Sequence, residues 1–306
     1  MSQLTNKVLM IRPACFFANP ETALDNSFQS PDNQNSQIHT LAQNEFDEVV
    51  DALENAGISV CVVQDNKVPQ TPDSLFPNNR LSFHGNGLAV AYPMKAENRR
   101  AERCLDVFPS LSKQGFFSLK HLLDYTEFEV QNLFLEGTGS MILDRKHKRV
   151  FAALSGRTDS IVIKQFCQDF GYESFLFEAG LQTQNNWHQI YHTNVMLSIG
   201  EDYALIALDA IKNQRQAGQI SEQLKLYGKT LISISLDQMK NFCANILQLR
   251  NKQDDKIIVM SKTAYDHFLP AQKHLLEKES EIIYIDIPNI ERASGGSVRC
   301  MLAEIF

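Results

Sequence analysis

The sequence lacks a long apolar run, a closely spaced pair of cysteines and any concentration of positive charge. A membrane-spanning helix needs about 20 consecutive apolar residues, and the opening MSQLTNKVLMIRPA also lacks the long apolar segment of a signal peptide. The net charge of −7 comes from acidic and basic residues mixed along the chain, so no basic stripe could neutralise a phosphate backbone. We therefore expect a cytoplasmic protein that binds neither membranes nor nucleic acid.

The six cysteines stand singly, without a CxxC or CxxH pattern, which argues against a zinc knuckle and against a disulfide framework. Five of them are expected to be small buried side chains, because free cysteine is among the most buried residue types. The sixth, Cys300, stands behind two glycines in GGSVRCM and is followed by six residues. We predict no metal ion and no organic cofactor.

The chain does contain enough apolar sequence, 43% of 306 residues, to fold as one large domain or two ordinary ones. Segments rich in β-branched residues and bounded by turn signals predict strands at 7–13, 58–64, 87–93, 140–154, 194–208, 229–235, 256–261 and 281–288. The segments 140–154 and 194–208 each hold a central turn and predict hairpins. Apolar residues recurring at every third or fourth position predict helices at 40–57, 97–108, 158–171, 221–228 and 263–278. The fold class is therefore α/β.

Five short polar motifs lie just before or at the head of strands, around Asn79, Glu136, Asn194, Asn245 and Cys300, at separations of 57, 58, 51 and 55 residues. Periods of this size are typical of propellers, in which each unit is one supersecondary piece stacked beside the next. The fifth unit runs out of chain after one strand, and the strand 7–13 could complete it, closing the ring and removing a sheet edge. We predict a single domain over residues 1–306, a fivefold pseudosymmetric α/β propeller closed by pairing of its N- and C-terminal strands. The alternative is that the spacings arise by chance.

Polar residues at equivalent strand starts of a closed ring would face a common axis, where they could form one site. Cys300 is a candidate nucleophile, and His192 in IYHTNVML is the best-placed proton carrier for it. Glu136 in FLEGTGSM should be partly buried, so it must either be protonated or meet a cation. Each also has a simpler interpretation, because Cys300 could be structural and Glu136 could belong to a structural ion pair. Together these residues favour a cysteine hydrolase or transferase.

The motifs FPNN, LEGTGSM, the GRT of ALSGRTDS, YHTN and GGSVRCM occur in an order and approximate spacing that resemble the guanidino-modifying enzymes. This superfamily includes arginine deiminase, dimethylarginine dimethylaminohydrolase and the arginine:glycine amidinotransferases, and the resemblance implies their fivefold α/β propeller, the pentein fold. It covers essentially the whole chain. Within the superfamily the sequence is most similar to the citrulline-utilisation hydrolases, and its opening MIRPACFFANPETA also resembles theirs.

The resemblance implies roles for individual residues. Cys300 matches the nucleophile, His192 the general acid and base, and Glu136 the carboxylate that holds the reacting head group. Asp73 matches a carboxylate that grips the same head group from the other side. Arg157 in SGRTD matches an arginine that binds the substrate's α-carboxylate. A planar guanidinium can donate two parallel hydrogen bonds to a planar carboxylate. The other substrate-binding candidates are Phe76, Asn78, Asn79, Asn194 and one of Arg99 and Arg100, whereas Asn245 is expected to be structural.

Two departures from the family pattern bear on the substrate. Arginine-consuming members carry Phe-x-x-Asp where this chain ends the motif with Asn79, and the deiminase pattern His-x-Asp ends here with Asn194. Losing one partner of a buried ion pair costs about 3–5 kcal/mol, so arginine should bind poorly. An asparagine NH2 can donate to the carbonyl oxygen of a neutral ureido group, which an aspartate would repel. The opposing interpretation is that Asn79 merely caps a turn and that Asp73 with Glu136 suffices for a guanidinium.

We therefore predict a cytoplasmic hydrolase without cofactor or metal that converts citrulline to ornithine, ammonia and carbon dioxide through a covalent adduct on Cys300. The partner is a free amino acid, and a homo-oligomer remains open. Arginine deiminase, dimethylarginine dimethylaminohydrolase or amidinotransferase activity with the same Cys-His-Glu triad is the alternative. A third possibility is a catalytically silent relative that binds an amino acid or a protein.

Overall fold

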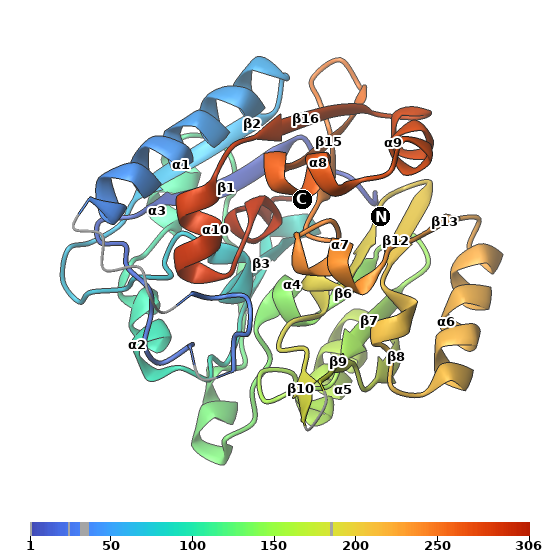
Figure 1. Cartoon of the computed structure of the whole chain (residues 1–306). Helices are drawn as coiled ribbons and strands as arrows, with labels where there is room; N and C mark the ends of the chain where they lie inside the picture. Colours follow the sequence, from blue (N-terminus) through green and yellow to red (C-terminus); the bar gives the residue numbers. More distant parts are fainter. Residues whose placement is uncertain (1, 24, 31–36, 184–185) are drawn as a thin grey trace.

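The computed structural model describes residues 2–23, 25–30, 37–183 and 186–306 and has a mixed α/β fold (Figure 1). Within these residues there are five three-stranded sheets and one two-stranded ribbon of β9 (Gly180–Gln182) and β10 (Trp187–Gln189). In each three-stranded sheet the middle strand pairs antiparallel with one neighbour and parallel with the other. The five sheets therefore share one pattern of strand pairing.

The strands of the five sheets, each in spatial order, are as follows. The first holds β17 (Ala303–Glu304), β1 (Lys7–Arg12) and β2 (Ser59–Gln64), and the second holds β3 (Leu81–His84), β4 (Leu88–Ala91) and β5 (His121–Asp124). The third holds β6 (Ile142–Asp144), β7 (Arg149–Ala153) and β8 (Glu173–Phe177). The fourth holds β11 (Leu197–Ile199), β12 (Tyr203–Ile206) and β13 (Thr230–Ser233), and the fifth holds β14 (Leu247–Arg250), β15 (Lys256–Ser261) and β16 (Glu281–Ile285).

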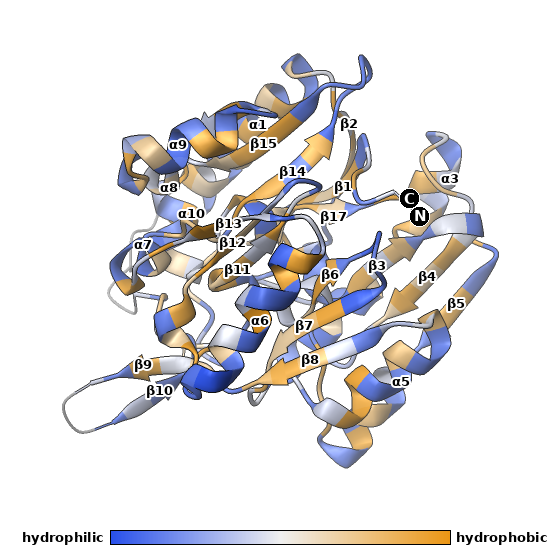
Figure 2. Cartoon of the chain, turned by 90° about the vertical axis from the view of Figure 1, so that its right-hand side faces the viewer, coloured by the Kyte–Doolittle hydropathy of each residue, from blue (hydrophilic) through white to orange (hydrophobic). Residues whose placement is uncertain are grey.

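The predicted pairing of the terminal strands is confirmed. Strand β1 lies between β17 and β2, with Val8 opposite Glu304 in the antiparallel pair (Figure 2). Both predicted hairpins are also present, with Ile142 opposite Phe151 in the first and Leu197 opposite Ile206 in the second. The last residues of the chain thus complete a sheet that its first strand begins.

The longer helices are amphipathic, and they follow the predicted segments with local differences. The described helices are α1 (Ile38–Asn55), α2 (Glu97–Arg100), α3 (Phe108–Lys113), α4 (Gly137–Ser140), α5 (Ser160–Phe170), α6 (Gln214–Leu226), α7 (Leu236–Lys240), α8 (Lys262–His267), α9 (Pro270–Glu277) and α10 (Pro288–Ser294). The predicted helix 263–278 is two helices, because Pro270 cannot continue a helix and begins a new one. The predicted helix 97–108 is wrong beyond Arg100, where the chain tightens into a 3-10 turn.

A short turn precedes the first strand of every sheet, and these turns carry the repeated polar motifs. They are the 3-10 turn Pro77–Asn79, helix α4, the 3-10 turn Thr193–Val195, the turn 241–244 and the 3-10 turn Val298–Met301. The turn Pro77–Asn79 packs against both α4 and Val298–Met301, and α4 packs against Thr193–Val195. Motifs far apart in the sequence are thereby brought together.

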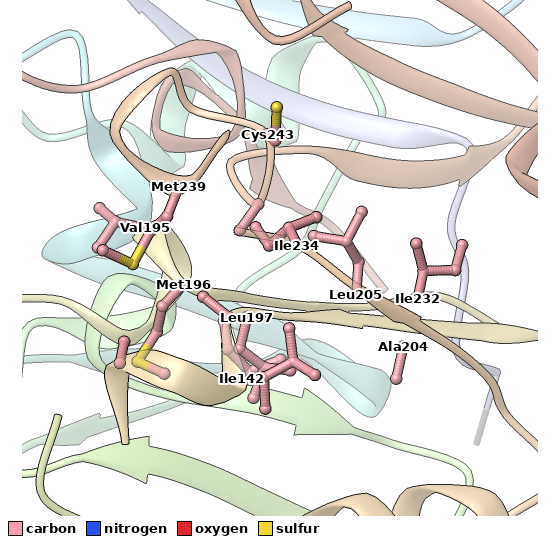
Figure 3. Close-up of a cluster of buried hydrophobic side chains, with 14 of the residues drawn as sticks. Ile142, Val195, Met196, Leu197, Ala204, Leu205, Ile232, Ile234, Met239 and Cys243 are labelled. Carbon is pink, nitrogen blue, oxygen red and sulfur yellow. The ribbon is translucent and has the colours of Figure 1, made fainter. Parts of the chain in front are cut away.

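Apolar side chains anchor these turns. Val195 and Met196 are buried with Leu197 and Ile142 in the core group that Figure 3 shows, and Val298 and Met301 are buried on either side of Cys300. Full burial of one such side chain stabilises the fold by about 1.5–3 kcal/mol. The backbone that carries the polar motifs is therefore fixed by the core. No helix among the described residues is long and apolar enough to cross a membrane.

Candidate active site

A narrow cavity collects most of the predicted site residues in its wall. The lining residues are Thr22, Asn26, Asp73, Phe76, Asn79, Arg99, Arg157, Tyr191, His192, Ser294, Gly296 and Cys300. The cavity volume is about 20 Å³, which is room for one water molecule. Binding of an amino acid therefore requires the walls to separate.

Cys300 owes its position to the two glycines before it. Gly295 ends α10 in the left-handed conformation, with φ +67°, which suits a residue without a side chain. A Cβ on Gly296 would lie 2.7 Å from the ring of Phe76, so the backbone approaches that ring as only glycine can. The next turn begins with the Cys300 N–H donating to Ser297 O at 2.9 Å. The glycines thus bring a 5% exposed thiol to the cavity wall.

His192 and Glu136 form a buried pair. The Nε2 atom of His192 lies 2.8 Å from Oε2 of Glu136, and neither residue is more than 3% exposed. Burial lowers the pKa of His192, although Glu136 acts to raise it. A neutral imidazole that donates its Nε2–H to Glu136 has Nδ1 free to accept a proton.

Glu136 is held as a carboxylate by several donors. Burial alone would raise its pKa, but the charge of Arg157, the hydrogen bond to His192 and the charge of Arg99 bring that pKa well below its ordinary value. Arg157 Nη1 lies 3.5 Å from Oε2, and the backbone N–H of Lys95 donates to Oε1 at 3.1 Å. Glu136 is not among the residues that line the cavity, and its carboxylate contacts His192, which is.

Asn79, in the cavity wall, carries a buried donor without a partner among the described residues. Arg99 Nη1 donates to Asn79 Oδ1 at 2.8 Å, and this fixes the amide orientation because a guanidinium can only donate. Among the described residues, Asn79 Nδ2 is buried and has no hydrogen-bond partner. A Cβ on Gly139 would lie 2.4 Å from this nitrogen and 2.9 Å from His192 Nδ1. Gly139 of the LEGTGSM motif thus leaves space for both groups.

Other side chains of the cavity wall are charged. Asp73 Oδ2 accepts a hydrogen bond from Asn19 Nδ2 at 2.7 Å. Arg157 pairs with Asp25, and Lys95 Nζ lies 2.7 Å from the same carboxylate. Burial would raise the pKa of Asp25, but Arg157 and Lys95 lower it. The guanidinium of Arg157, which is predicted to bind the α-carboxylate of a substrate, is therefore already paired with the carboxylate of Asp25.

Three predicted substrate-binding residues lie outside the cavity wall. Asn78 is the middle residue of its 3-10 turn, so it points about 120° away from Asn79 and its Nδ2 donates to Thr138 Oγ1 at 3.4 Å. Arg100 is one helical step, about 100°, from Arg99 and donates to Met94 O at 2.9 Å. Asn194 contacts Cys300 Sγ from the other side and not the cavity. Their predicted roles in substrate binding stay predictions.

Sequence reasoning also missed residues that the fold places at the site. Asn245, predicted to be structural, donates from Nδ2 to Cys300 Sγ at 3.2 Å. Tyr191 also lines the cavity, and the Arg157 guanidinium lies over its ring, 5.0 Å from the ring centroid. The position of Tyr191 next to His192 in YHTN could have indicated this place in the site. Asp25 had no local signal. Among the described residues no group of three or more His, Cys, Asp and Glu side chains could hold a metal ion.

A larger cavity, of about 650 Å³, lies next to the candidate site and contains none of the predicted residues. Phe28 in its wall packs edge-on against Tyr191, with ring centroids 6.1 Å apart. These two rings separate it from the cavity that holds Cys300.

Comparisons with known proteins give a family and a fold. A family model described as N,N dimethylarginine dimethylhydrolase, eukaryotic, matches residues 12–306, and no curated protein matches. Among solved structures, the chain is similar to ArgZ, an arginine dihydrolase from the ornithine-ammonia cycle in cyanobacteria, with 16% identity and a TM-score of 0.74. The alignment covers 98% of this chain and 40% of the ArgZ chain, or 97% of an ArgZ N-terminal domain.

Two further structures are similar. Unliganded AgrE has 16% identity and a TM-score of 0.72, over 98% of this chain and 39% of its own. A dimethylarginine dimethylaminohydrolase in an adduct with 4-chloro-2-hydroxymethylpyridine has 14% identity and a TM-score of 0.63, over 98% and 99% of the two chains. The chain thus spans about two fifths of the full ArgZ and AgrE chains. At these identities the likeness shows a shared mixed α/β fold.

Proposed function

The chain belongs to the N,N dimethylarginine dimethylhydrolase family of the guanidino-modifying enzymes, and we propose that it hydrolyses free citrulline to ornithine, ammonia and carbon dioxide. Enzymes of this group hydrolyse C–N bonds of guanidino compounds, and a ureido group differs from a guanidino group by one carbonyl oxygen in place of a nitrogen. The proposal concerns which of these head groups the site accepts.

The observation that carries the proposal is the free N–H of Asn79. Asn79 lines the cavity, its Oδ1 is engaged by Arg99, and its buried Nδ2 has no partner among the described residues. A buried donor without a partner costs about 1–3 kcal/mol. A ureido oxygen would remove that cost by accepting the hydrogen bond, whereas a guanidinium has only N–H groups and would face a second donor. The site therefore favours a neutral carbonyl head group.

In the proposed mechanism the thiol proton of Cys300 passes to His192, and the resulting thiolate attacks the ureido carbon. A C–S bond forms, one C–N bond breaks, and His192 returns the proton to the departing nitrogen. Water then gives a proton to His192 as its oxygen attacks the thioester carbon. The C–S bond breaks, the sulfur recovers the proton, and the released carbamic acid loses carbon dioxide to free the second nitrogen. Asn79 supports the oxyanion in both additions, a contribution of about 3–4 kcal/mol in other enzymes.

Hydrolysis of arginine or a methylated arginine is the second candidate. Two carboxylates remain at the site, with Asp73 in the cavity wall and Glu136 behind His192, and a guanidinium could pair with Asp73. The family description and the arginine dihydrolase ArgZ also support this alternative. Amidino transfer would use the same residues.

We also propose that the five sheets close into one fivefold propeller domain over residues 1–306. The pairing of β1 with β17 supports closure, and so do the contacts of β17 with β3, of β6 with β11 and of β11 with β14. If the ring is closed, deletion of residues 303–306 should abolish cooperative urea unfolding, because it opens the sheet that joins the ends. Retained cooperative unfolding would contradict closure.

The substrate is tested by incubating the purified protein with citrulline or arginine and quantifying ornithine, citrulline and ammonia. We expect ornithine and ammonia from citrulline, in equal amounts, and no product with Cys300→Ala. Faster consumption of arginine than of citrulline overturns the substrate assignment. Full activity of Cys300→Ala overturns the mechanism.

A further inference from the structure

The sulfur of Cys300 is held by two buried amides on the side away from the cavity. Asn194 Nδ2 lies 3.3 Å and Asn245 Nδ2 lies 3.2 Å from Sγ, and neither amide is more than 1% exposed. Both distances are within the range of an N–H···S hydrogen bond. Neither residue is part of the proposed Cys-His-Glu triad.

The orientation of Asn245 follows from a second contact. Its Nδ2 also donates to the backbone oxygen of Asn194 at 3.4 Å, and a carbonyl oxygen can only accept. The nitrogen end of this amide therefore faces the sulfur, with Oδ1 farther away at 3.7 Å. A protonated thiol can donate to that oxygen, whereas a thiolate can accept from both nitrogens.

The fold brings these three residues together through equivalent positions. Asn194 lies in the turn before β11, Asn245 between the turn 241–244 and β14, and Cys300 in the turn before β17. The core fixes all three turns, so both donors are in place before any substrate arrives. Such preorganised donors stabilise charge without a reorganisation cost.

We propose that Asn194 and Asn245 are catalytic residues that hold Cys300 as a thiolate by donating two hydrogen bonds to its sulfur. Hydrogen bonds to the charged form of a group favour that form, and the thiolate is the nucleophile. A neutral ureido substrate brings no positive charge to the sulfur, so the protein has to supply this stabilisation. An aspartate at position 194, as in the deiminase pattern, would place a carboxylate oxygen against the sulfur and oppose the thiolate.

Charged and titratable groups face Cys300 on its other side, and the test has to separate them from the amides. They line the same cavity and comprise Asp73, Arg99, Arg157, Tyr191 and His192. Arg299, next to Cys300 in the chain, directs its guanidinium to Leu302 O and Glu304. Substitution of the two amides leaves all these groups unchanged, so a shift in reactivity reports on the amides.

The experiment measures alkylation of Cys300 by iodoacetamide as a function of pH, without substrate. The background is Cys104→Ser, because Cys104 is exposed and would react as well, and modification of Cys300 is followed by mass spectrometry of its peptide. Asn245→Leu removes one donor at similar volume, and Asn194→Asp replaces the other by a carboxylate. Gln248→Leu is the control, because it removes another buried amide, which bonds to Ser280 and not to the sulfur.

We expect the pH midpoint of alkylation to rise by about one to two units in Asn245→Leu and in Asn194→Asp, so that the rate at pH 7 falls about 10- to 100-fold. The plateau rate at high pH and the midpoint of the control should stay unchanged. An unchanged midpoint in both amide variants, with cooperative thermal unfolding retained, overturns the proposal. A fall of the plateau without a shift of the midpoint, which reports blocked access, overturns it as well.

One further variant covers the case in which Asn245→Leu does not fold. Asn245→Asp keeps the shape of the side chain and should raise the midpoint at least as far, because it adds repulsion to the loss of the donor. The inference rests on the proposed function only in that Cys300 is the nucleophile. Since no substrate is used, a wrong substrate assignment leaves this result intact, and an unshifted midpoint leaves the substrate assay intact.

Discussion

Replacing Asn79 by aspartate should reverse the preference of the site between ureido and guanidino head groups. The exchange leaves Oδ1, the acceptor for Arg99 Nη1 at 2.8 Å, in place. The second end of the side chain changes from an Nδ2–H2 without a partner among the described residues to a carboxylate oxygen. The fold should tolerate the change, because the added charge lies beside the Arg99 guanidinium. The effect is thus confined to what the cavity offers the substrate.

The expected size of the effect follows from the lost donor. Removal of one oxyanion-stabilising donor costs about 3–4 kcal/mol in other enzymes, which corresponds to about a 100- to 1,000-fold loss of kcat/KM for citrulline. Repulsion between the introduced carboxylate and the developing oxyanion acts in the same direction. For arginine, the same carboxylate gains a partner in the guanidinium, so kcat/KM for arginine should rise.

The assay compares kcat/KM for the two substrates in wild type and Asn79→Asp, with ornithine and citrulline quantified separately. Asn78→Asp is the matched control: the same chemical change one residue earlier, at a side chain that contacts Thr138 and not the cavity. Its ratio of the two kcat/KM values should equal that of wild type. The reasoning is refuted if Asn79→Asp folds and keeps its citrulline kcat/KM within about threefold of wild type, well short of the loss expected from a missing oxyanion donor.

Three further predictions concern the charged and titratable groups. Glu136→Gln should lower kcat at least about 100-fold, because His192 loses the anion that orients it. It should also lower stability, by less than the about 3–5 kcal/mol of a fully broken buried pair, because Arg157 and Arg99 lose Glu136 but keep Asp25 and Glu102. Arg99→Ala should destabilise the protein by more than about 2 kcal/mol, whereas Arg100→Ala should change stability by no more than about 1 kcal/mol, both measured by urea unfolding. Stability should fall by up to about 1.4 kcal/mol per buried histidine for each pH unit below about 6.5, and His84→Phe should reduce that slope.

The sign of the last prediction follows from the direction of the pKa shifts. Burial, with the nearby charges of Arg145 and Lys148, brings the pKa of His84 well below its ordinary value, and burial lowers that of His192. Both rings are therefore neutral in the folded state at pH values where the unfolded chain is already protonated. The unfolded state binds more protons, so stability rises with pH in that window and is lost as the pH falls through it. An equal slope in wild type and His84→Phe would contradict the assignment.

Equal effects of Arg99→Ala and Arg100→Ala would contradict the second prediction, since the two side chains differ in burial and in partners. Arg99 is 2% exposed and bonds to Glu102 at 2.7 Å. For Glu136→Gln, a normal kcat with reduced stability would show that the carboxylate only balances charge. Single-turnover rates measured on the folded fraction separate the two contributions.

Much of the fold could be predicted because its signals are local. Runs of β-branched residues between turn residues predicted β1, β2, β15 and both hairpins. The motifs, separated by 57, 58, 51 and 55 residues, lie at the turns that precede the first strand of each sheet. The short strands that lack a β-branched run were missed. The segment 121–124, for example, has no β-branched residue and forms strand β5 through parallel pairing with β4.

The site could be predicted only in part, because a side chain's direction within a turn depends on contacts that the sequence does not display. Spacing brought Asn79 and Cys300 to equivalent turns, yet it could not tell that Asn78 turns away while Asn79 faces the cavity. Asn245, in the fourth repeat, was predicted to be structural. Its contact with the sulfur requires the turns before β14 and β17 to be neighbours, which is a property of the assembled fold.

In the proposed reaction, asparagines at or next to the repeated turns donate hydrogen bonds to two different atoms, the substrate oxygen and the sulfur of Cys300. Because each of these atoms carries negative charge during the reaction, an amide suits each place better than a carboxylate. Asn79 lines the cavity, where the substrate oxygen would become negative in the proposed reaction, and Asn194 with Asn245 contacts the sulfur that we propose they hold as a thiolate. A carboxylate at either place would sit against an anion in a low-dielectric interior, where unfavourable interactions are strongest. A site for a cationic guanidinium has no such requirement at the head group, because the substrate itself carries the compensating charge. The amides at 79 and 194 are therefore one electrostatic adaptation, and single substitutions to aspartate should each impair citrulline turnover by acting at a different step.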